Sequence, residues 1–301
     1  MRQILILIVV ILVISPLTVF GQAYIQSDFM LSSKFKQKEV EGMLGSGSMI
    51  KLSGGFTLPF YTKKTHLGQA SSWFTSLNGS STTSSNKGLA SQYNPREVAN
   101  LTLSLGYMGP LSKKWSMIAM LGGGVFAEPS HVSWKSVLIN GGAIFIYRVN
   151  KTLSLGAGAG VTNAYGVPIA MPMIYLKFNV VGKYEFKIDL STKVEIAGIA
   201  KFGKRFELKL TGVEMDGISA VMKKDNKSMI YSSSLVRSYI MPEFKLGKHG
   251  ILFSGVGAVW ARTSKMSERS IKSFWKSFKE NSDEYYFKPS GYFTVGIRCG
   301  F

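Results

Sequence analysis

The chain has 301 residues, 18% of them charged, and its 36 Lys and Arg against 17 Asp and Glu give a formal net charge of +19. A single cysteine excludes an internal disulfide and a thiolate metal site, and the three histidines lie too far apart to form a metal-binding pair. We therefore expect no metal or other cofactor, and the surplus of positive charge indicates contact with an anionic surface.

Residues 1–21 have the pattern of a secretory signal peptide. Arg2 supplies the positive n-region, Ile4 to Ile14 form an apolar run, and small residues precede a cleavage position between Gly21 and Gln22. The run is shorter than the ~20 residues of a membrane-spanning helix. Export argues against nucleic acid as the anionic partner. Outer-membrane lipids and lipopolysaccharide are expected instead, or else a scatter of Lys and Arg at both membrane interfaces.

From residue 48 onward, apolar side chains alternate with small or polar ones, which is the pattern of β-strands. In residues 98–108, for example, Leu101, Leu103 and Leu105 share one face, and the other face carries Asn, Thr, Ser and Gly. Residues 152–162 repeat this design. An inner face of small and polar residues is typical of a transmembrane barrel. Strands of about 9–11 residues are long enough to cross the bilayer when tilted.

The pattern recurs in segments at 48–58, 98–108, 114–126, 137–148, 152–162, 172–181, 184–190, 193–200, 205–213, 229–244, 250–262 and 290–301. Every second connection is short, at 109–113, 149–151, 182–183, 201–204 and 245–249, and most others are longer. Short turns at one end and long loops at the other are typical of outer-membrane barrels.

The sequence therefore predicts an all-β fold, a transmembrane antiparallel β-barrel of about 12 strands, with 10–14 as the range. The barrel is expected to occupy residues 48–301, with a periplasmic segment at 22–47 before it. An even strand count places both termini on the periplasmic side. If 184–200 is one long strand, the count is nearer ten.

The C-terminal segment has apolar residues at alternate positions and ends on an aromatic residue. Phe293, Val295, Ile297 and Phe301 share one face. This arrangement resembles the recognition strand of outer-membrane barrels. The resemblance implies a location in the bacterial outer membrane and the barrel-assembly machinery as a partner.

Two further features resemble exported proteins of Bacteroidota. One is the Gly21–Gln22 junction, together with the high Lys content. The other is the stretch 166–172 running into 174–178, which resembles an uncharacterised barrel family of that phylum. That resemblance implies a porin-like barrel and gives no indication of any particular activity.

Charged residues alternate with apolar ones in several segments. Because a charge in lipid is costly, they are expected to face the lumen. The predicted lumen charges are Lys51, Arg148, Lys177, Glu185, Lys187, Asp189, Lys193, Glu195, Glu207 and Lys209. The clusters of both signs between 183 and 209 predict a salt-bridged wall that fills the lumen, whereas basic residues left free would favour anionic solutes. Only barrels of about 16 strands or more are expected to hold a clear aqueous channel.

Two long connections are expected. Residues 59–97 are polar and of low complexity, which predicts an extracellular loop. In 263–289, apolar residues at helical spacing with lysines among them predict a basic amphipathic helix that Ser270 caps. Its residues are Ile271, Lys272, Phe274, Trp275, Lys276 and Phe278. Such a helix lies on the outer leaflet, docks into the barrel mouth as a gate, or packs on neighbouring loops.

His131 and Ser133 are two residues apart, which would place them on one face of a strand. The pair resembles the His-x-Ser of outer-membrane phospholipases and lipid A deacylases, with Asn140 as the nearby group that would orient the base. The Asn-Gly that commonly follows this serine in the phospholipases is replaced by Trp134 and Lys135. Asn140 is also expected to face the lumen, whereas a lipid-cleaving site should face the bilayer.

These patterns predict a non-enzymatic outer-membrane barrel that passes small solutes narrowly or has a structural or surface role. One alternative is an outer-membrane lipid hydrolase that uses His131 and Ser133. The other is a secreted soluble β protein.

Overall fold

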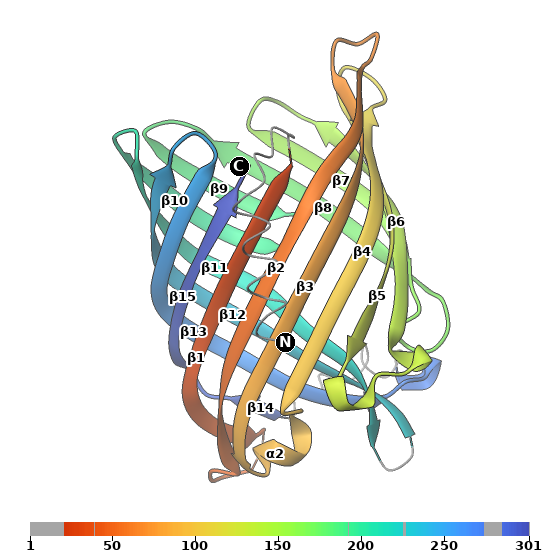
Figure 1. The fold of residues 1–301 in the computed structure, drawn as a ribbon, viewed down its shortest axis with the longest axis vertical. Helices are drawn as coiled ribbons and strands as arrows, with labels where there is room; N and C mark the ends of the chain where they lie inside the picture. Colours follow the sequence, from red (N-terminus) through yellow and green to blue (C-terminus); the bar gives the residue numbers. More distant parts are fainter. Residues whose placement is uncertain (1–20, 39, 192, 225–226, 274–284, 301) are drawn as a thin grey trace.

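The computed structural model describes residues 21–38, 40–191, 193–224, 227–273 and 285–300. In this part of the chain, consecutive antiparallel strands close into one barrel (Figure 1). The strands are β1 (Gln22–Gln37), β2 (Gly45–Lys64), β3 (Ala70–Gly88), β4 (Glu97–Pro110), β5 (Trp115–Ala127), β6 (Val137–Arg148), β7 (Leu153–Thr162), β8 (Ile169–Val180), β9 (Tyr184–Leu190), β10 (Val194–Phe202), β11 (Phe206–Lys224), β12 (Lys227–Leu246), β13 (Gly250–Glu268), β14 (Tyr285–Phe287) and β15 (Ser290–Cys299). No helix in these ranges has the length and apolar character needed to cross a bilayer.

The wall of the barrel has 14 strand positions, because β14 and β15 occupy one position in succession between β1 and β13. Strand β15 closes the barrel by pairing with β1, in a register that sets Cys299 opposite Ala23 and Thr294 opposite Asp28. The start of β1 and the end of β15 therefore lie at the same end of the barrel.

The hairpins β2–β3, β4–β5, β6–β7, β8–β9, β10–β11 and β12–β13 are also joined at this end, which we call the turn end (top in Figure 1). The opposite end is the loop end. It holds the short helical segments α2 (Ala90–Tyr93), η1 (Pro129–His131) and η2 (Trp134–Ser136). The five predicted short connections all lie at the turn end, as the sequence indicated.

All twelve predicted segments correspond to strands, and the additional strands are β1, β3 and the short β14, of which β1 and β3 add two positions to the wall. Residues 22–37, expected to precede the barrel, form β1 between β2 and β15. The expected extracellular loop 59–97 instead contains the end of β2, all of β3 and α2. Backbone pairing of β3 with both β2 and β4 stabilises this strand even though its side chains are mostly Ser and Thr. Residues 184–200 form two strands.

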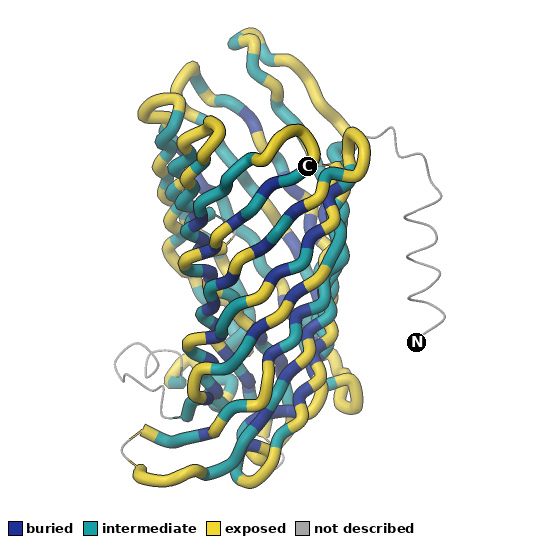
Figure 2. The backbone as a smooth tube through the Cα atoms, turned by 90° about the vertical axis from the view of Figure 1, so that its left-hand side faces the viewer, coloured by how far each residue is buried: buried dark blue, intermediate teal, exposed yellow. Residues whose placement is uncertain are grey.

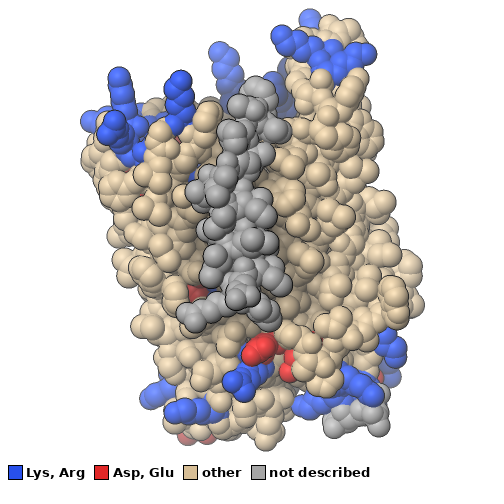
Figure 3. Space-filling model, viewed as in Figure 1, with Lys and Arg blue, Asp and Glu red and all other residues tan. Residues whose placement is uncertain are grey.

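The alternation follows the two faces of the wall (Figure 2). On β4 the outward side chains of Leu101, Leu103 and Leu105 are about half exposed, whereas the inward Ser104 is buried. Figure 3 shows Lys and Arg gathered toward the two ends, with a belt between them in which few charged side chains reach the surface. An apolar belt flanked by charged ends is the surface of a barrel that sits in a bilayer, and a soluble β protein would leave this belt in water.

The inner face is packed. Gly158 and Gly160 on β7 leave space for neighbours, since a Cβ at Gly158 would lie 2.7 Å from the Cα of Ile144, and one at Gly160 would lie 3.0 Å from the Sδ of Met173. The small residues of the inner face thus accommodate larger side chains from adjacent strands.

In the loop-end half of the barrel, the long strand β11 crosses the interior and contacts the opposite wall. Strands β11–β13 have 19 or 20 residues and β9 only 7, and β11 reaches β5 through a parallel bridge between Val221 and Ala127. Apolar side chains from both walls pack together inside, among them Met49, Val98 and Ile218.

Candidate functional site

The most densely connected group of functional side chains is a charged network inside the barrel. Its centre is Arg237 on β12, whose side chain is only 4% exposed. Nη2 of Arg237 lies 2.5 Å and Nε 3.1 Å from Oε1 of Glu214 on β11. Glu214 also accepts hydrogen bonds from Nζ of Lys193 at 3.0 Å and from the hydroxyl of Tyr239 at 2.6 Å. Both oxygens of this buried carboxylate therefore have cationic partners.

The network joins opposite walls of the barrel. Lys51 on β2 donates from Nζ to Oδ2 of Asp216 on β11 at 2.5 Å, and β11 is the fifth strand from β2 around the barrel. Asp28 on β1, 1% exposed, lies 3.7 Å from Nη1 of Arg237 and accepts a hydrogen bond from the hydroxyl of Tyr292 at 2.6 Å. The network therefore includes a direct contact between strands that are far apart around the barrel wall.

A second cluster surrounds Glu195 on β10, whose side chain is 1% exposed. Nζ of Lys187 lies 3.0 Å and Nζ of Lys193 3.3 Å from its carboxylate, and Lys209 also donates to it. Asp189 lies 3.4 Å from Lys187. Burial of a carboxylate is tolerated because several ammonium groups offset its loss of hydration.

Three further ion pairs lie nearer the turn end, each joining strands of the same half of the barrel. They are Glu185–Lys201, Glu207–Lys245 and Glu243–Arg298. Every acid of the network thus has a base within ion-pair distance. A network with both signs in balance fills space and holds strands together, and it offers no excess of one charge to a passing solute.

The structure places most of the predicted lumen charges in these contacts. Arg148 and Lys177 are exposed and make no ion pair within the described ranges. The sequence analysis did not identify these further members of the network: Asp28, Lys201, Glu214, Asp216, Arg237, Tyr239, Glu243, Lys245, Tyr292 and Arg298. The missed residues on β12 stand at every second position, so the alternating pattern of that segment could have identified them as lumen-facing. The same pattern could not identify Asp28, because residues 22–37 were not predicted to be a strand.

The predicted His-x-Ser pair does not lie on a strand. His131 ends η1 and Ser133 precedes η2, in the connection between β5 and β6. Nδ1 of His131 lies 3.0 Å from Ser130 Oγ and 3.4 Å from Glu128 Oε2, so a single ring nitrogen faces both partners. A catalytic histidine needs its nucleophile and its orienting acid on different nitrogens.

Ser133 has a structural role and Asn140 lies apart from it. The side chain of Ser133 forms a capping box with Ser136 at the start of η2. Asn140 is on β6 with its neighbour Ile139 55% exposed, so Asn140 faces the lumen, as its position in the alternation predicts. No hydrogen bond joins His131, Ser133 and Asn140 to one another within the described ranges.

The predicted interface helix is described only at its start. Residues 271–273 form a helical turn, and Ser270 Oγ accepts a hydrogen bond from the backbone N–H of Ser273 at 3.2 Å, so Ser270 caps this turn. Ile271 and Lys272 are exposed. Phe274, Trp275, Lys276 and Phe278 lie outside the described residues.

The C-terminal strand presents its apolar face outward. Phe293 is 44% exposed and packs on Phe29 with ring centroids 5.8 Å apart, while Val295 is 37% exposed. Ile297 is half-buried, and Cys299 is exposed on the same face. Phe301 lies outside the described residues.

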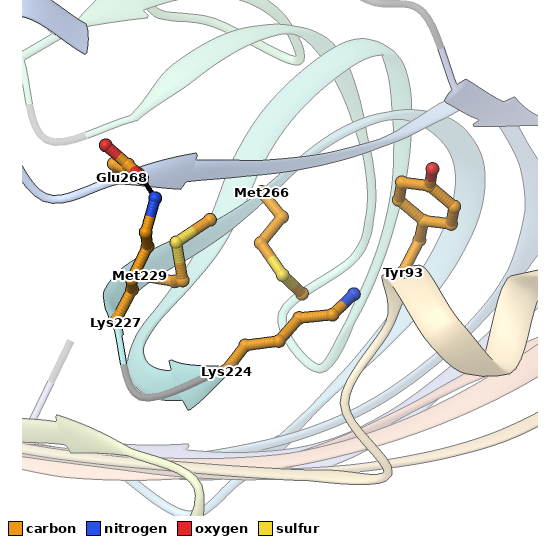
Figure 4. A pocket seen from close by; sticks show the side chains of 6 residues that line it. All are labelled: Tyr93, Lys224, Lys227, Met229, Met266 and Glu268. Atoms are coloured by element: carbon orange, nitrogen blue, oxygen red, sulfur yellow. Dashed lines mark hydrogen bonds and ion pairs between the residues drawn. The ribbon is translucent and has the colours of Figure 1, made fainter.

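A cavity of about 310 Å³ opens at the loop end, between α2 and the tips of β11–β13 (Figure 4). Lys224 donates to the carbonyl of Gln92 at 3.2 Å, and its ammonium group lies 5.5 Å from the ring centroid of Tyr93. Lys227 pairs with Glu268 at 2.5 Å. Both cations of this cavity are thus engaged by the protein. Across the residues that the structure describes, no group of three or more His, Cys, Asp and Glu side chains is arranged to hold a metal ion.

Comparison with curated proteins found no match. Among solved structures, the chain is similar to the β domain of the Bordetella autotransporter BrkA, with 9% identity and a TM-score of 0.28, covering 93% of this chain and 99% of that chain. It is also similar to the translocator domain of the autotransporter NalP from Neisseria meningitidis (10% identity, TM-score 0.30, covering 93% and 88%).

The outer-membrane protease OmpT from Escherichia coli is a third similar structure, at 9% identity and a TM-score of 0.26, covering 93% of this chain and 96% of that chain. At these scores the three likenesses imply nothing about the activity of this chain.

A family model described as "Domain of unknown function (DUF6268)" matches residues 17–300, nearly the whole length. The matched range includes all strands of the barrel and both clusters of the charged network. The chain therefore belongs to the DUF6268 family.

Proposed function

We propose that this protein is an outer-membrane β-barrel with a closed lumen, and that it has a structural or surface-interaction role and no catalytic activity. The contact between Lys51 and Asp216 carries this proposal, because it ties β2 directly to β11 across the interior. The apolar core around Met49, Val98 and Ile218 fills the space on the loop-end side of that contact.

The membrane location is supported by the surface of the barrel. Outward leucines on β4 and Ile174 on β8, which is 73% exposed, belong to the belt between the two charged ends. With short turns and both chain ends at one end, that end is periplasmic and the loop end faces outward. The location in a bacterium of the Bacteroidota, implied by the sequence resemblance, is part of this proposal, as is insertion by the barrel-assembly machinery through β15.

Narrow passage of small solutes is the second candidate. It is favoured by a polar inner wall near the turn end, where Thr57 donates to Ser76 at 3.2 Å and Asn78 donates to the same hydroxyl at 2.8 Å. This wall would wet a vestibule that leads to the charged network.

Single-channel recording in a planar bilayer, with and without a salt gradient, separates the two. We expect the refolded protein to be silent while its band still shifts on heating before electrophoresis, which shows a folded barrel. Steady conductance steps with anion preference would contradict the closed lumen and favour the passage of small solutes as the function. A protein that is folded and monodisperse without detergent would contradict the membrane location itself.

A further inference from the structure

The hairpin connections at the turn end are basic and contain no acidic residue. No Asp or Glu occurs in 59–72, 109–116, 147–154, 180–184, 202–206 or 245–250. The exposed cations of these connections, which we call the basic rim, are Lys63, Lys64, Lys113, Lys114, Arg148, Lys151, Lys183, Lys204, Arg205 and Lys248. In Figure 3 the charged side chains seen at this end are all Lys and Arg, whereas acidic ones appear among them at the loop end.

The nearest acids are turned away from the rim. Glu185, Glu207 and Glu243 lie close to the turn end in the sequence, but their side chains point into the lumen, where each is paired with a base of the charged network. No ion pair joins a rim cation to an acid within the described ranges. The positive charge of the rim is therefore left for a partner outside the barrel.

Aromatic residues form a girdle directly beside the rim. Trp115 packs on Tyr147 and Trp73 on Tyr107, each pair with ring centroids 5.1 Å apart. Lys114 lies 5.8 Å from the ring centroid of Tyr147. Aromatic girdles mark the membrane–water interface of transmembrane barrels, where the rings sit at headgroup level. Because the rim cations lie directly beside these rings, they are at the depth of the lipid phosphate groups.

The loop end differs in its charge pattern. Glu41, Glu97, Glu128 and Glu268 stand among its lysines and arginines, and Glu268 pairs with Lys227. If cations were placed at the turn end only because it is a membrane interface, acidic residues would be expected among them, as at the loop end. The absence of acidic residues from the turn end therefore indicates an anionic partner outside the barrel.

We propose that the basic rim binds anionic phospholipid headgroups, of the phosphatidylglycerol or cardiolipin type, in the leaflet that surrounds the turn end. This inference rests on the membrane location proposed above and adds the headgroup class and the leaflet. A ring of cations without ion-pair partners attracts a net negative headgroup over a zwitterionic one, and the attraction grows with each Lys or Arg near the anionic surface. With the turn end periplasmic, the partner is phospholipid and not lipopolysaccharide.

The test uses the full-length folded protein in detergent, mixed with equal amounts of phosphatidylglycerol, cardiolipin and phosphatidylethanolamine. Native mass spectrometry counts the lipids retained per barrel, at low and high salt. One variant changes four rim lysines in three neighbouring turns to glutamine: Lys113, Lys114, Lys151 and Lys183. The matched control changes four loop-end lysines to glutamine: Lys34, Lys38, Lys87 and Lys135. Both variants have the same net charge, and heat modifiability verifies that both are folded.

We expect the wild type and the loop-end control to retain anionic lipid in preference to zwitterionic lipid. The rim variant should bind it about tenfold or more weakly, since several cations act together, and high salt should weaken binding in all three. Equal loss in both variants would show a response to net charge alone and overturn the proposal. So would undiminished binding by the rim variant, equal retention of phosphatidylethanolamine, or competition by lipopolysaccharide for the rim. Failure of the membrane location would instead appear as a folded protein that needs no detergent.

Discussion

Replacement of Arg237 by Met tests whether the charged network stabilises the barrel. The side chain of Arg237 is 4% exposed and lies within 4 Å of three carboxylates, at 2.5 Å from Glu214, 3.6 Å from Asp216 and 3.7 Å from Asp28. Met retains much of the side-chain volume and removes the charge. Glu214 keeps Lys193 as a partner, and Asp216 keeps Lys51.

Asp28 is the residue that the substitution leaves without a cation. Its remaining hydrogen bonds come from neutral donors, the Tyr292 hydroxyl at 2.6 Å and Nε2 of Gln26 at 2.7 Å. Removing one partner of a buried ion pair typically costs about 3–5 kcal/mol, because the other charge is left buried and uncompensated. Since only one of three carboxylates loses its last cation, we expect R237M to lower the free energy of unfolding by about 3 kcal/mol.

Urea unfolding in lipid vesicles measures this loss, with the D28N single variant and the D28N/R237M double variant beside it. Asn at position 28 is neutral and still accepts the hydrogen bond from Tyr292, so the double variant should recover most of the lost stability. A loss of less than about 1 kcal/mol in R237M would refute the reasoning, because a buried pair would then contribute no more than an exposed one. A double variant no more stable than R237M would show that the cost does not arise at Asp28.

Three further predictions follow from the wall and the loops. Gly158→Val should prevent folding or lower the free energy of unfolding by about 1–3 kcal/mol or more, because a Cβ there would lie 2.0 Å from the carbonyl oxygen of Ala143. Ala157→Val, on the outward face of the same strand, should be tolerated. Gels that compare the electrophoretic mobility of each variant before and after heating test both expectations. Leu103→Lys, at the middle of β4, should cost about 2–4 kcal/mol in vesicles and Leu246→Lys, outward at the turn end of β12, about 0–1 kcal/mol, and equal costs would contradict the placement of the belt. Ser133→Ala should leave any release of fatty acid from detergent-dispersed lipid unchanged; loss of release in this variant would restore the hydrolase alternative.

Most of the wall was predictable because strand alternation and turn length are local properties. Leucines at alternate positions of 98–108 identify β4 without knowledge of its neighbours. Strands β1 and β3 lacked this signal. In β3 the outward positions include Thr75, Gly79 and Ser81, so the lipid-facing pattern is weak, and only pairing with β2 and β4 establishes it as a strand.

The candidate site was predictable only in part. Alternation indicates that Glu195 and Lys209 share the lumen face, but it does not say which charges meet. Lys51 and Asp216 are 165 residues apart in the sequence, and their contact depends on how far β11 leans across the barrel. The His131–Ser133 hypothesis was wrong about the local structure, because two short 3₁₀ turns interrupt the spacing that a strand would have given.

The sequence by itself determined that this chain is a transmembrane-type β-barrel with short turns at one end and an apolar outer face, because both properties are encoded in residues close together along the chain. The tertiary structure decided the strand number, the closure of β1 on β15 and the contacts that side chains make across the lumen. These depend on the registers and unequal lengths of strands that are distant in the sequence, since a one-residue slip or a shorter β11 would separate the side chains that now meet across the interior.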